Sequence, residues 1–205
     1  MIGVTIGMGA YTELGVLAAA RVSRMTGLEV HVIDDEMAMS SGHHDPVIVK
    51  LSLPQYVAPG QSFLYFDSDI VMLRPWDPRV HEDDPLLVAV RDQYVDHYDL
   101  DLDIPRPVYF NCGMFIAHPE HHWHIFELAR QLWLAEGDRL AMADQTALNR
   151  AALWLNSPVR LIDERYNFLR YHLRGGDRAN VVMAHYTPHG RELAHVHLRR
   201  LNEQR

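Results

Sequence analysis

One apolar run of this chain ends in two carboxylates. Residues 63–66 are apolar or aromatic, and Asp67-Ser68-Asp69 follows them directly. A continuous apolar run predicts a strand buried on both faces, and ligands of open α/β sheets bind at the carboxyl ends of strands. Two like charges in such a place need a compensating cation or proton. We therefore interpret Asp67 and Asp69 as a site for a hard divalent cation, Mn²⁺ or Mg²⁺.

The alternative for these residues is an ordinary turn. Asp-Ser-Asp is common turn and cap chemistry, and a second triplet, Asp101-Leu102-Asp103, lies in a charged stretch that we interpret as a loop. The apolar run in front of Asp67 favours the cation site for the first triplet.

A second apolar run, residues 108–117, is interrupted by Asn111-Cys112-Gly113. A polar amide and a glycine inside a strand indicate a bulge or a close approach of the backbone to a ligand. We do not interpret Cys112 as a nucleophile, because buried cysteines are common and no basic residue is adjacent in the sequence.

Further polar residues lie at the ends of predicted elements. Asp144 and Gln145 begin a helix predicted from residue 143; capping accounts for Asp144 but less well for Gln145. His185 ends a predicted buried strand, where it is either a core histidine or a third metal ligand. Residues 121–124 contain three histidines in the first turn of a helix predicted for 119–136. We favour a solvated turn there, since no acidic or cysteine partner has zinc-site spacing.

The elements that position these residues alternate between strands and helices. A strand at 4–6, a helix at 12–25 capped by Thr12 and stopped by Gly27, and a strand at 29–34 form a βαβ unit and predict a parallel sheet. Gly7-x-Gly9 fits a loop near a nucleotide, although Thr12 stands where a dinucleotide fingerprint has its third glycine. Further strands are predicted at 86–90, 108–117, 159–162 and 181–185, with a last helix after residue 190.

Composition limits the class of protein. The 205 residues suit one domain, 1–205, and 48% hydrophobic with 22% charged residues is typical of a soluble globular protein. No apolar run approaches the roughly 20 residues of a membrane span, no secretory leader is recognisable, and one cysteine suits a reducing compartment, so we expect a cytoplasmic protein. A net charge of -8 argues against nucleic acid as the main partner but not against a small phosphate ligand.

In this order the motifs resemble glycosyltransferase family 8, the retaining enzymes that include glycogenin and bacterial lipopolysaccharide galactosyltransferases. The resemblance rests on five segments along nearly the whole chain: Tyr65–Val71, Phe110–Met114, Asp144-Gln145-x-x-Leu148-Asn149, Tyr166-Asn167 and His185. It implies a single α/β domain of the GT-A type, with a mostly parallel mixed sheet flanked by helices. It also implies a metal-dependent retaining transferase that moves a hexose from a UDP-sugar to a glycan, lipid-linked or protein acceptor.

The resemblance assigns roles position by position. Asp67, Asp69 and His185 would hold Mn²⁺, or Mg²⁺, against the donor diphosphate. Asp144, Gln145 and Asn111 would act around the donor sugar and its anomeric carbon. The remaining donor-binding positions are Thr5, Gly7, Tyr11, Lys50, Ser68, Gly113 and Arg191. This chain departs from the family pattern where Pro188 replaces a glycine, removing a backbone donor, and where Arg191 replaces a lysine.

Several reactions remain open at this point. Retention is possible with the leaving phosphate taking the acceptor's proton on the same face, or through a covalent step at Asp144. A nucleotide-sugar hydrolase and a non-catalytic sugar-nucleotide or glycan-binding protein share the same motifs. A haloacid-dehalogenase-type phosphatase also has an apolar strand before Asp-x-Asp, but it needs a downstream lysine, and Lys50, the chain's single lysine, lies upstream.

Overall fold

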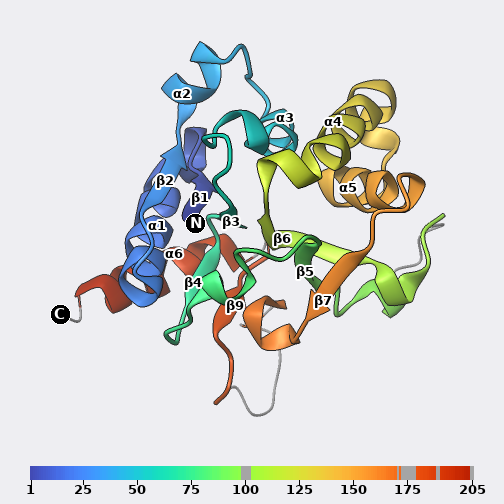
Figure 1. Ribbon diagram of the computed structural model, residues 1–205. Coiled ribbons are helices and arrows are strands. Elements are labelled where there is room, and N and C mark those ends of the chain that lie inside the picture. Colours follow the sequence, from blue (N-terminus) through green and yellow to red (C-terminus); the bar gives the residue numbers. More distant parts are fainter. Residues whose placement is uncertain (98–102, 170, 172–178, 188–189, 204–205) are drawn as a thin grey trace.

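A mixed sheet forms the centre of the molecule. The computed structural model describes residues 1–97, 103–169, 171, 179–187 and 190–203. Within them, six strands pair in the order β2-β1-β3-β6-β5-β7, with helices on both faces (Figure 1). The strands are β1 (Ile2–Ile6), β2 (Val30–Ile33), β3 (Phe63–Phe66), β5 (Leu87–Arg91), β6 (Phe110–Ala117) and β7 (Val159–Ile162). Only β6 runs antiparallel to its neighbours, which confirms the expected mostly parallel sheet.

A smaller sheet lies beside the first. Its strands are β4 (Ile70–Met72), β9 (Met183–His185) and β8 (Phe168–Leu169), with β9 in the middle. The apolar residues on the two sides of Asp67–Asp69 therefore belong to different sheets. Between them the chain turns, with the Ile70 amide donating to the Asp67 carbonyl at 3.0 Å, so the two carboxylates lie at a junction rather than inside a buried ladder.

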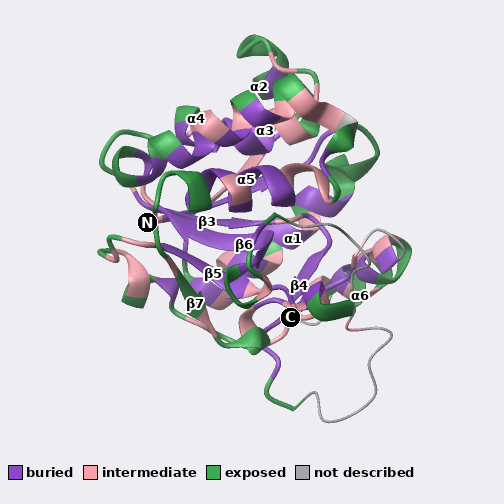
Figure 2. Cartoon of the chain, turned by 90° about the vertical axis from the view of Figure 1, so that its right-hand side faces the viewer, coloured by how far each residue is buried: buried purple, intermediate pink, exposed green. Residues whose placement is uncertain are grey.

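Helices cover the large sheet in two layers. They are α1 (Thr12–Thr26), α2 (Asp35–Ser40), α3 (Pro46–Leu51), α4 (Pro119–Glu136), α5 (Ala143–Trp154) and α6 (Arg191–Glu203). The short 3₁₀ helices are Gly9–Tyr11, Leu53–Gln55, Pro78–His81, Val95–His97, Arg106–Val108, Gly137–Arg139 and Glu164–Tyr166. Figure 2 shows the buried strands between α3, α4 and α5 on one side and α6 with β4 on the other.

Alternation along β3 explains why both faces are covered. Phe63 and Tyr65 pack with the α3, α4 and α5 side, whereas Leu64 and Phe66 pack with α1, α6 and the small sheet. All four side chains are buried. A strand apolar on both faces is stable only between two layers, and this one places its end, with Asp67, at the centre of the molecule.

The start of α1 differs from expectation. Tyr11, not Thr12, is the N-cap of α1, and it makes no side-chain cap bond. The Thr12 hydroxyl instead donates to the Gly9 carbonyl at 2.8 Å, which ties the helix to the turn before it. Gly27 ends the helix as predicted, with a left-handed φ of 70°. The structure also adds α2, whose N-cap Asp34 accepts from the Met37 amide.

The histidines of α4 are not all solvated, so that expectation was wrong for His122. Its side chain is buried, its Nδ1 accepts from the His118 amide at 2.9 Å, and its Nε2 donates to the Pro85 carbonyl at 3.3 Å. Burial lowers the pKa of His122 to about 4. A charged ring would place an Nδ1–H against the His118 N–H, so the histidine is a neutral core residue.

Among the described residues, no helix combines the length and the apolar character that crossing a bilayer requires.

We predict that His122 makes the fold sensitive to mild acid. Its pKa in the folded state is about 4, below the ordinary 6.5, so its contribution to stability is complete above about pH 6.5 and is lost as the pH falls to about 4. Over that window the free energy of unfolding should fall by up to about 3 kcal/mol more in the wild type than in His122→Asn, which keeps an acceptor for His118. Urea titrations at several pH values measure this difference. Parallel pH profiles of the two proteins would show that His122 is not the group responsible.

Candidate active site

Two strand pairings bring the predicted metal ligands together. β3 and β6 pair antiparallel, and the Asp67 amide continues that ladder by donating to the Gly113 carbonyl at 2.7 Å. β4 and β9 pair antiparallel with Ile70 opposite His185, and the Tyr186 amide donates to the Asp69 carbonyl at 3.1 Å. The Asp-x-Asp turn therefore lies between the Asn-Cys-Gly segment of one sheet and the final histidine of the other.

Asp67, Asp69 and His185 fit a divalent cation. Each offers a ligand atom, and these atoms lie within 4.8 Å of one another. His185 Nε2 is 3.3 Å from Asp69 Oδ1 and 3.8 Å from Asp67 Oδ2. Two carboxylates with one imidazole form a donor set that suits Mn²⁺. Burial opposes a charge on His185, but Asp69 and then Asp67 outweigh it and raise its pKa, which indicates how strongly this cluster attracts positive charge.

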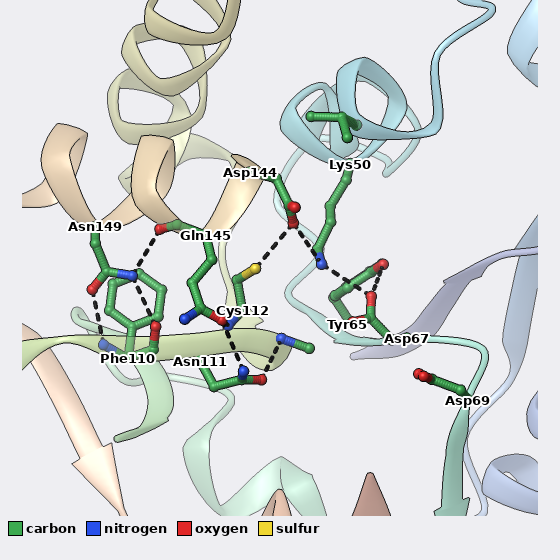
Figure 3. A network of polar contacts seen from close by, with 12 residues as sticks. Lys50, Tyr65, Asp67, Asp69, Phe110, Asn111, Cys112, Asp144, Gln145 and Asn149 are labelled. Atoms are coloured by element: carbon green, nitrogen blue, oxygen red, sulfur yellow. Dashed lines mark hydrogen bonds and ion pairs between the residues drawn. The ribbon is translucent and has the colours of Figure 1, made fainter. Parts of the chain in front are cut away.

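Lys50 lies between two carboxylates of the site. It projects from α3, which begins at Pro46 after the N-cap Asp45. Its Nζ is 3.0 Å from Asp67 Oδ1 and 2.8 Å from Asp144 Oδ2, and Figure 3 shows the ammonium between them. Burial disfavours the charge, but Asp144 and Asp67 outweigh burial and raise the pKa of Lys50 well above its usual value. Lys50 is therefore a fixed internal cation.

Asp67 divides its two oxygens between different partners. Oδ1 accepts from Lys50 and, at 2.5 Å, from the Tyr65 hydroxyl, while Oδ2 faces His185. Burial raises the pKa of Asp67 despite the opposing effects of Lys50 and His185. One oxygen is thus held by the protein, and the other remains for a metal.

Asp144 lies in the first turn of α5 but does not cap the helix. The N-cap is Met142, without a side-chain cap bond, and the Asp144 carboxylate instead contacts Lys50 and accepts from Cys112 Sγ at 3.0 Å. Burial would raise the pKa of Asp144, but Lys50 and Cys112 outweigh it and lower it. Burial raises the pKa of Cys112 well above its usual value, which keeps the thiol protonated and agrees with its exclusion as a nucleophile.

Asn149 fixes α5 against β6. Its side chain accepts from the Phe110 amide and donates to the Phe110 carbonyl, both at 2.8 Å, in the way that a neighbouring strand would (Figure 3). One turn earlier, Gln145 Oε1 accepts from Asn111 Nδ2 at 2.8 Å. These hydrogen bonds hold the start of α5 against the Asn111-Cys112-Gly113 segment of β6.

A pocket of about 470 Å³ collects most of the predicted residues. Those that line it are Tyr11, Lys50, Asp67, Ser68, Asp69, Asn111, Gly113, Asp144, Gln145 and His185. Apolar residues such as Pro46, Val47 and Met142 form part of its wall. The carboxylates and amides therefore face one shared space large enough for a small ligand.

Three predicted donor-binding residues do not line this pocket. Thr5 is buried in β1, and its hydroxyl has no hydrogen-bond partner among the described residues. Gly7 is explained by packing, since a Cβ there would lie 3.5 Å from the Gly15 backbone and 2.9 Å from a Val32 methyl. Arg191 does not line the pocket, but its guanidinium lies 5.0 Å from the ring centre of Tyr11, which does. Pro188, like Asp101 of the second triplet, falls outside the described residues.

Sequence reasoning missed two residues of the site. Tyr65 holds Asp67, and its position two residues earlier on the same strand face is a signal that could have found it. Asp92 follows the buried strand β5 as Asp67 follows β3, and it accepts from Gln145 Nε2 at 2.9 Å. A carboxylate directly after a buried strand was the available signal for Asp92.

Fold and site together define a glycosyltransferase domain of the GT-A type. The sequence profile of Glycosyl transferase family 8 matches residues 35–190, which is more than half of the chain. The chain therefore belongs to glycosyltransferase family 8, as its motifs predicted. No curated protein sequence matches it.

Solved structures agree on the fold. An active-site mutant of LgtC has a TM-score of 0.69 at 19% identity, with 97% of this chain and 95% of that one covered. The galactosyltransferase LgtC in complex with donor and acceptor sugar analogues gives 0.68 at 20% identity, covering 91% and 87%. The glycosyltransferase GlyE of Streptococcus pneumoniae TIGR4 gives 0.70 at 15% identity, covering 96% of this chain and 59% of that one. At these identities the similarity is one of fold alone.

We predict that Gly113→Ala weakens metal binding. A Cβ at residue 113 would overlap the His185 ring, with Nδ1 only 2.8 Å away, so the imidazole must move from its place beside Asp69. The affinity for Mn²⁺, measured by calorimetric titration, should fall about 10-fold or more. Gly3→Ala is the matched control, because its Cβ would crowd a Val30 methyl at 2.8 Å, away from the site. Wild-type Mn²⁺ affinity in Gly113→Ala would contradict this role of the glycine.

Proposed function

We propose that this family 8 enzyme is a metal-dependent retaining hexosyltransferase that uses a UDP-sugar as donor and a carbohydrate-bearing acceptor, whether glycan, lipid-linked or protein. The observation that carries the proposal is the shared pocket, which is lined both by the cluster of Asp67, Asp69 and His185 and by Asp144 and Gln145. A metal-ligand set next to sugar-orienting groups suits cleavage of a sugar–diphosphate bond.

The first part of the site acts on the leaving group. When bound at Asp67, Asp69 and His185, Mn²⁺ or Mg²⁺ supplies Lewis-acid stabilisation of the charge on the departing diphosphate. Lys50 keeps Asp67 in place and adds a buried positive charge near that group. Arg191, whose guanidinium lies over the Tyr11 ring, offers a planar group for phosphate oxygens. Ser68 and Gly113 also line the pocket.

The second part of the site acts on the sugar, which gains positive charge as the bond breaks. Asp144, with its lowered pKa, remains an anion facing the pocket. Gln145 and Asn111 are tied to one another and orient sugar hydroxyls. Tyr11 is exposed enough to stack on the nucleotide base, with Thr5 and Gly7 shaping the strand end beside it. The acceptor enters over the remaining apolar wall.

The LgtC complex supports this assignment, because that protein of the same fold holds donor and acceptor sugar analogues. We propose further that residues 1–205 act as a single domain and that the enzyme works in the cytoplasm. The proposed cytoplasmic location is supported by the one cysteine, Cys112, which is buried and forms no disulfide.

Two other functions use the same site. A nucleotide-sugar hydrolase differs only in taking water as the acceptor, and a binding protein differs in having no turnover. The presence of Asp144 together with Asp67, Asp69 and His185 favours catalysis over binding alone. A site that only binds the donor needs no anion such as Asp144 beside the sugar. The family membership leaves the phosphatase alternative without support.

The test is nucleoside-diphosphate release from a panel of UDP-sugars, with Mn²⁺ or with chelator. We expect metal-dependent release from at least one donor, reduced about 100-fold or more in Asp69→Ala, because the cation loses a ligand. Asp83→Asn, which changes an exposed carboxylate, is the control and should match the wild type. NMR of the product should show a retained anomeric configuration.

The outcomes separate the alternatives. Release that accelerates when acceptors are added identifies a transferase, whereas release of free hexose at a rate independent of acceptors identifies the hydrolase. Tight binding of UDP and Mn²⁺ with no release from any donor and acceptor pair would identify the binding protein and overturn the proposed activity.

A further inference from the structure

A chain of hydrogen-bonded, buried side chains leads from the candidate metal ligand His185 past Gln145 to Asp92. Its members, in order, are Asp92, Gln145, Asn111, Asn167 and His185, and each is less than one tenth exposed. Gln145 Nε2 donates to Asp92 at 2.9 Å, Asn111 Nδ2 to Gln145 at 2.8 Å, and Asn167 Nδ2 to Asn111 at 2.8 Å. Asn167 Oδ1 lies 3.0 Å from His185 Nδ1. Figure 3 shows the middle of this chain, from Gln145 to Asn111.

Groups that can only donate, or only accept, a hydrogen bond set the direction of the hydrogen bonds along this series. The Gly113 amide can only donate, and it faces Asn111 at 2.9 Å, so the Asn111 atom there is the oxygen. The Cys112 amide likewise faces Gln145 Oε1 at 3.3 Å. At the other end the Asp92 carboxylate can only accept, so Gln145 must turn its amino group toward it. Each amide therefore has one orientation.

The direction of the chain determines the state of His185. Since Asn111 presents its oxygen to Asn167, Asn167 donates there with its amino group and turns its own oxygen to His185 Nδ1. That oxygen accepts only from an Nδ1–H, so the neutral imidazole carries its proton on Nδ1 and its lone pair on Nε2. Nε2 is the atom that faces Asp69 and Asp67, and without a metal their carboxylates favour a proton there, so the Asn167 oxygen must hold the proton on Nδ1 against them. A metal ligand needs its lone pair at that position.

We propose that Asn167 and Asp92 are positioning residues that hold His185 in the metal-binding tautomer, Asn167 directly and Asp92 through Gln145 and Asn111. The proposal rests on the proposed function only in taking Asp67, Asp69 and His185 as a metal site. It also links the metal side of the pocket to Gln145 on the sugar side, because both depend on one chain of hydrogen bonds.

The first test is nitrogen NMR of protein labelled with ¹⁵N-histidine, without metal or donor, at an alkaline pH where His185 is neutral. The His185 signals are assigned by their loss in His185→Gln. In the wild type we expect a protonated Nδ1 and a bare Nε2. A proton on Nε2 in the wild type overturns the proposal without any further variant.

The second test compares two substitutions of Asn167. Asn167→Asp keeps an acceptor for His185 Nδ1 but cannot donate to Asn111, whereas Asn167→Ala loses both bonds. We expect Asn167→Asp to keep the Nδ1–H tautomer, and Asn167→Ala to populate the Nε2–H tautomer and to bind Mn²⁺ about 10- to 100-fold more weakly. Mn²⁺ affinity is read by electron paramagnetic resonance without a sugar donor. An Nε2–H tautomer in Asn167→Asp, or wild-type tautomer and affinity in Asn167→Ala, would overturn the proposal.

Asp92→Asn tests the end of the hydrogen-bonded series that lies farthest from His185. One Asp92 oxygen accepts from the Tyr94 amide at 2.8 Å, and the other accepts from Gln145 at 2.9 Å and from Asn111 Nδ2 at 3.4 Å; an asparagine has only one oxygen to offer. If its oxygen stays with Tyr94, its amino group forces Gln145 to turn over. Asn111 then meets the Gly113 amide with its own amino group. We expect a mixed tautomer at His185 and weaker Mn²⁺ binding, while an unchanged His185 spectrum would remove Asp92 from the proposal.

These tests separate this inference from the proposed function. Tautomer and Mn²⁺ affinity are measured without donor or turnover, so they hold or fail whether or not a UDP-sugar is the substrate. Absence of Mn²⁺ binding in the wild type would overturn both the proposed function and this inference. Normal Mn²⁺ binding without a fixed Nδ1–H tautomer at His185 would overturn only the role of the hydrogen-bonded side chains.

Discussion

The structure depends on how it tolerates carboxylates at the buried end of its central strand. Asp67, Asp69 and Asp144 bring three negative charges to one pocket, against which the protein sets Lys50. At an effective dielectric constant of about 20, two like charges 4.8 Å apart repel by about 3 kcal/mol, which exceeds the worth of an ordinary hydrogen bond. One lysine compensates Asp144 and one oxygen of Asp67, and the remaining negative charge is what a divalent cation would neutralise.

Topology makes this concentration of charge possible. β3 supplies Asp67, the turn into the small sheet supplies Asp69, and β9 returns from the end of the chain with His185. Gly113 leaves room for the imidazole, because any larger residue there would occupy the ring's place. The site therefore belongs to the junction of two sheets, and neither sheet alone could form it.

The sequence predicted those parts of the site whose signal is local. An apolar run before Asp67 fixed the strand and its charged end, and the interruption at Asn111-Cys112-Gly113 indicated the bulge, which the structure has where β5 and β6 shift register after Ala89. Parallel pairing of β1 and β2 followed from the short βαβ unit. In each case neighbouring residues carry enough information to specify the geometry.

Residues whose partners are distant in sequence could not be predicted in this way. Asp144 is an ordinary capping residue until α3 brings Lys50 to it, and His122 is an ordinary first-turn histidine until the segment before β5 brings Pro85. Asp92 is linked to the site through Gln145, and Asn167 through Asn111 and His185, and these partners come from other elements. Tertiary contacts decide such residues, and local patterns do not contain them.

The most direct test of the central claim is anomalous diffraction from crystals of the protein soaked in Mn²⁺. The account predicts one strong peak bounded by Asp67 Oδ2, Asp69 and His185 Nε2, with Lys50 still bridging Asp67 and Asp144. A protein that binds Mn²⁺ only elsewhere, or that leaves this cluster without a peak at saturating Mn²⁺, would contradict it.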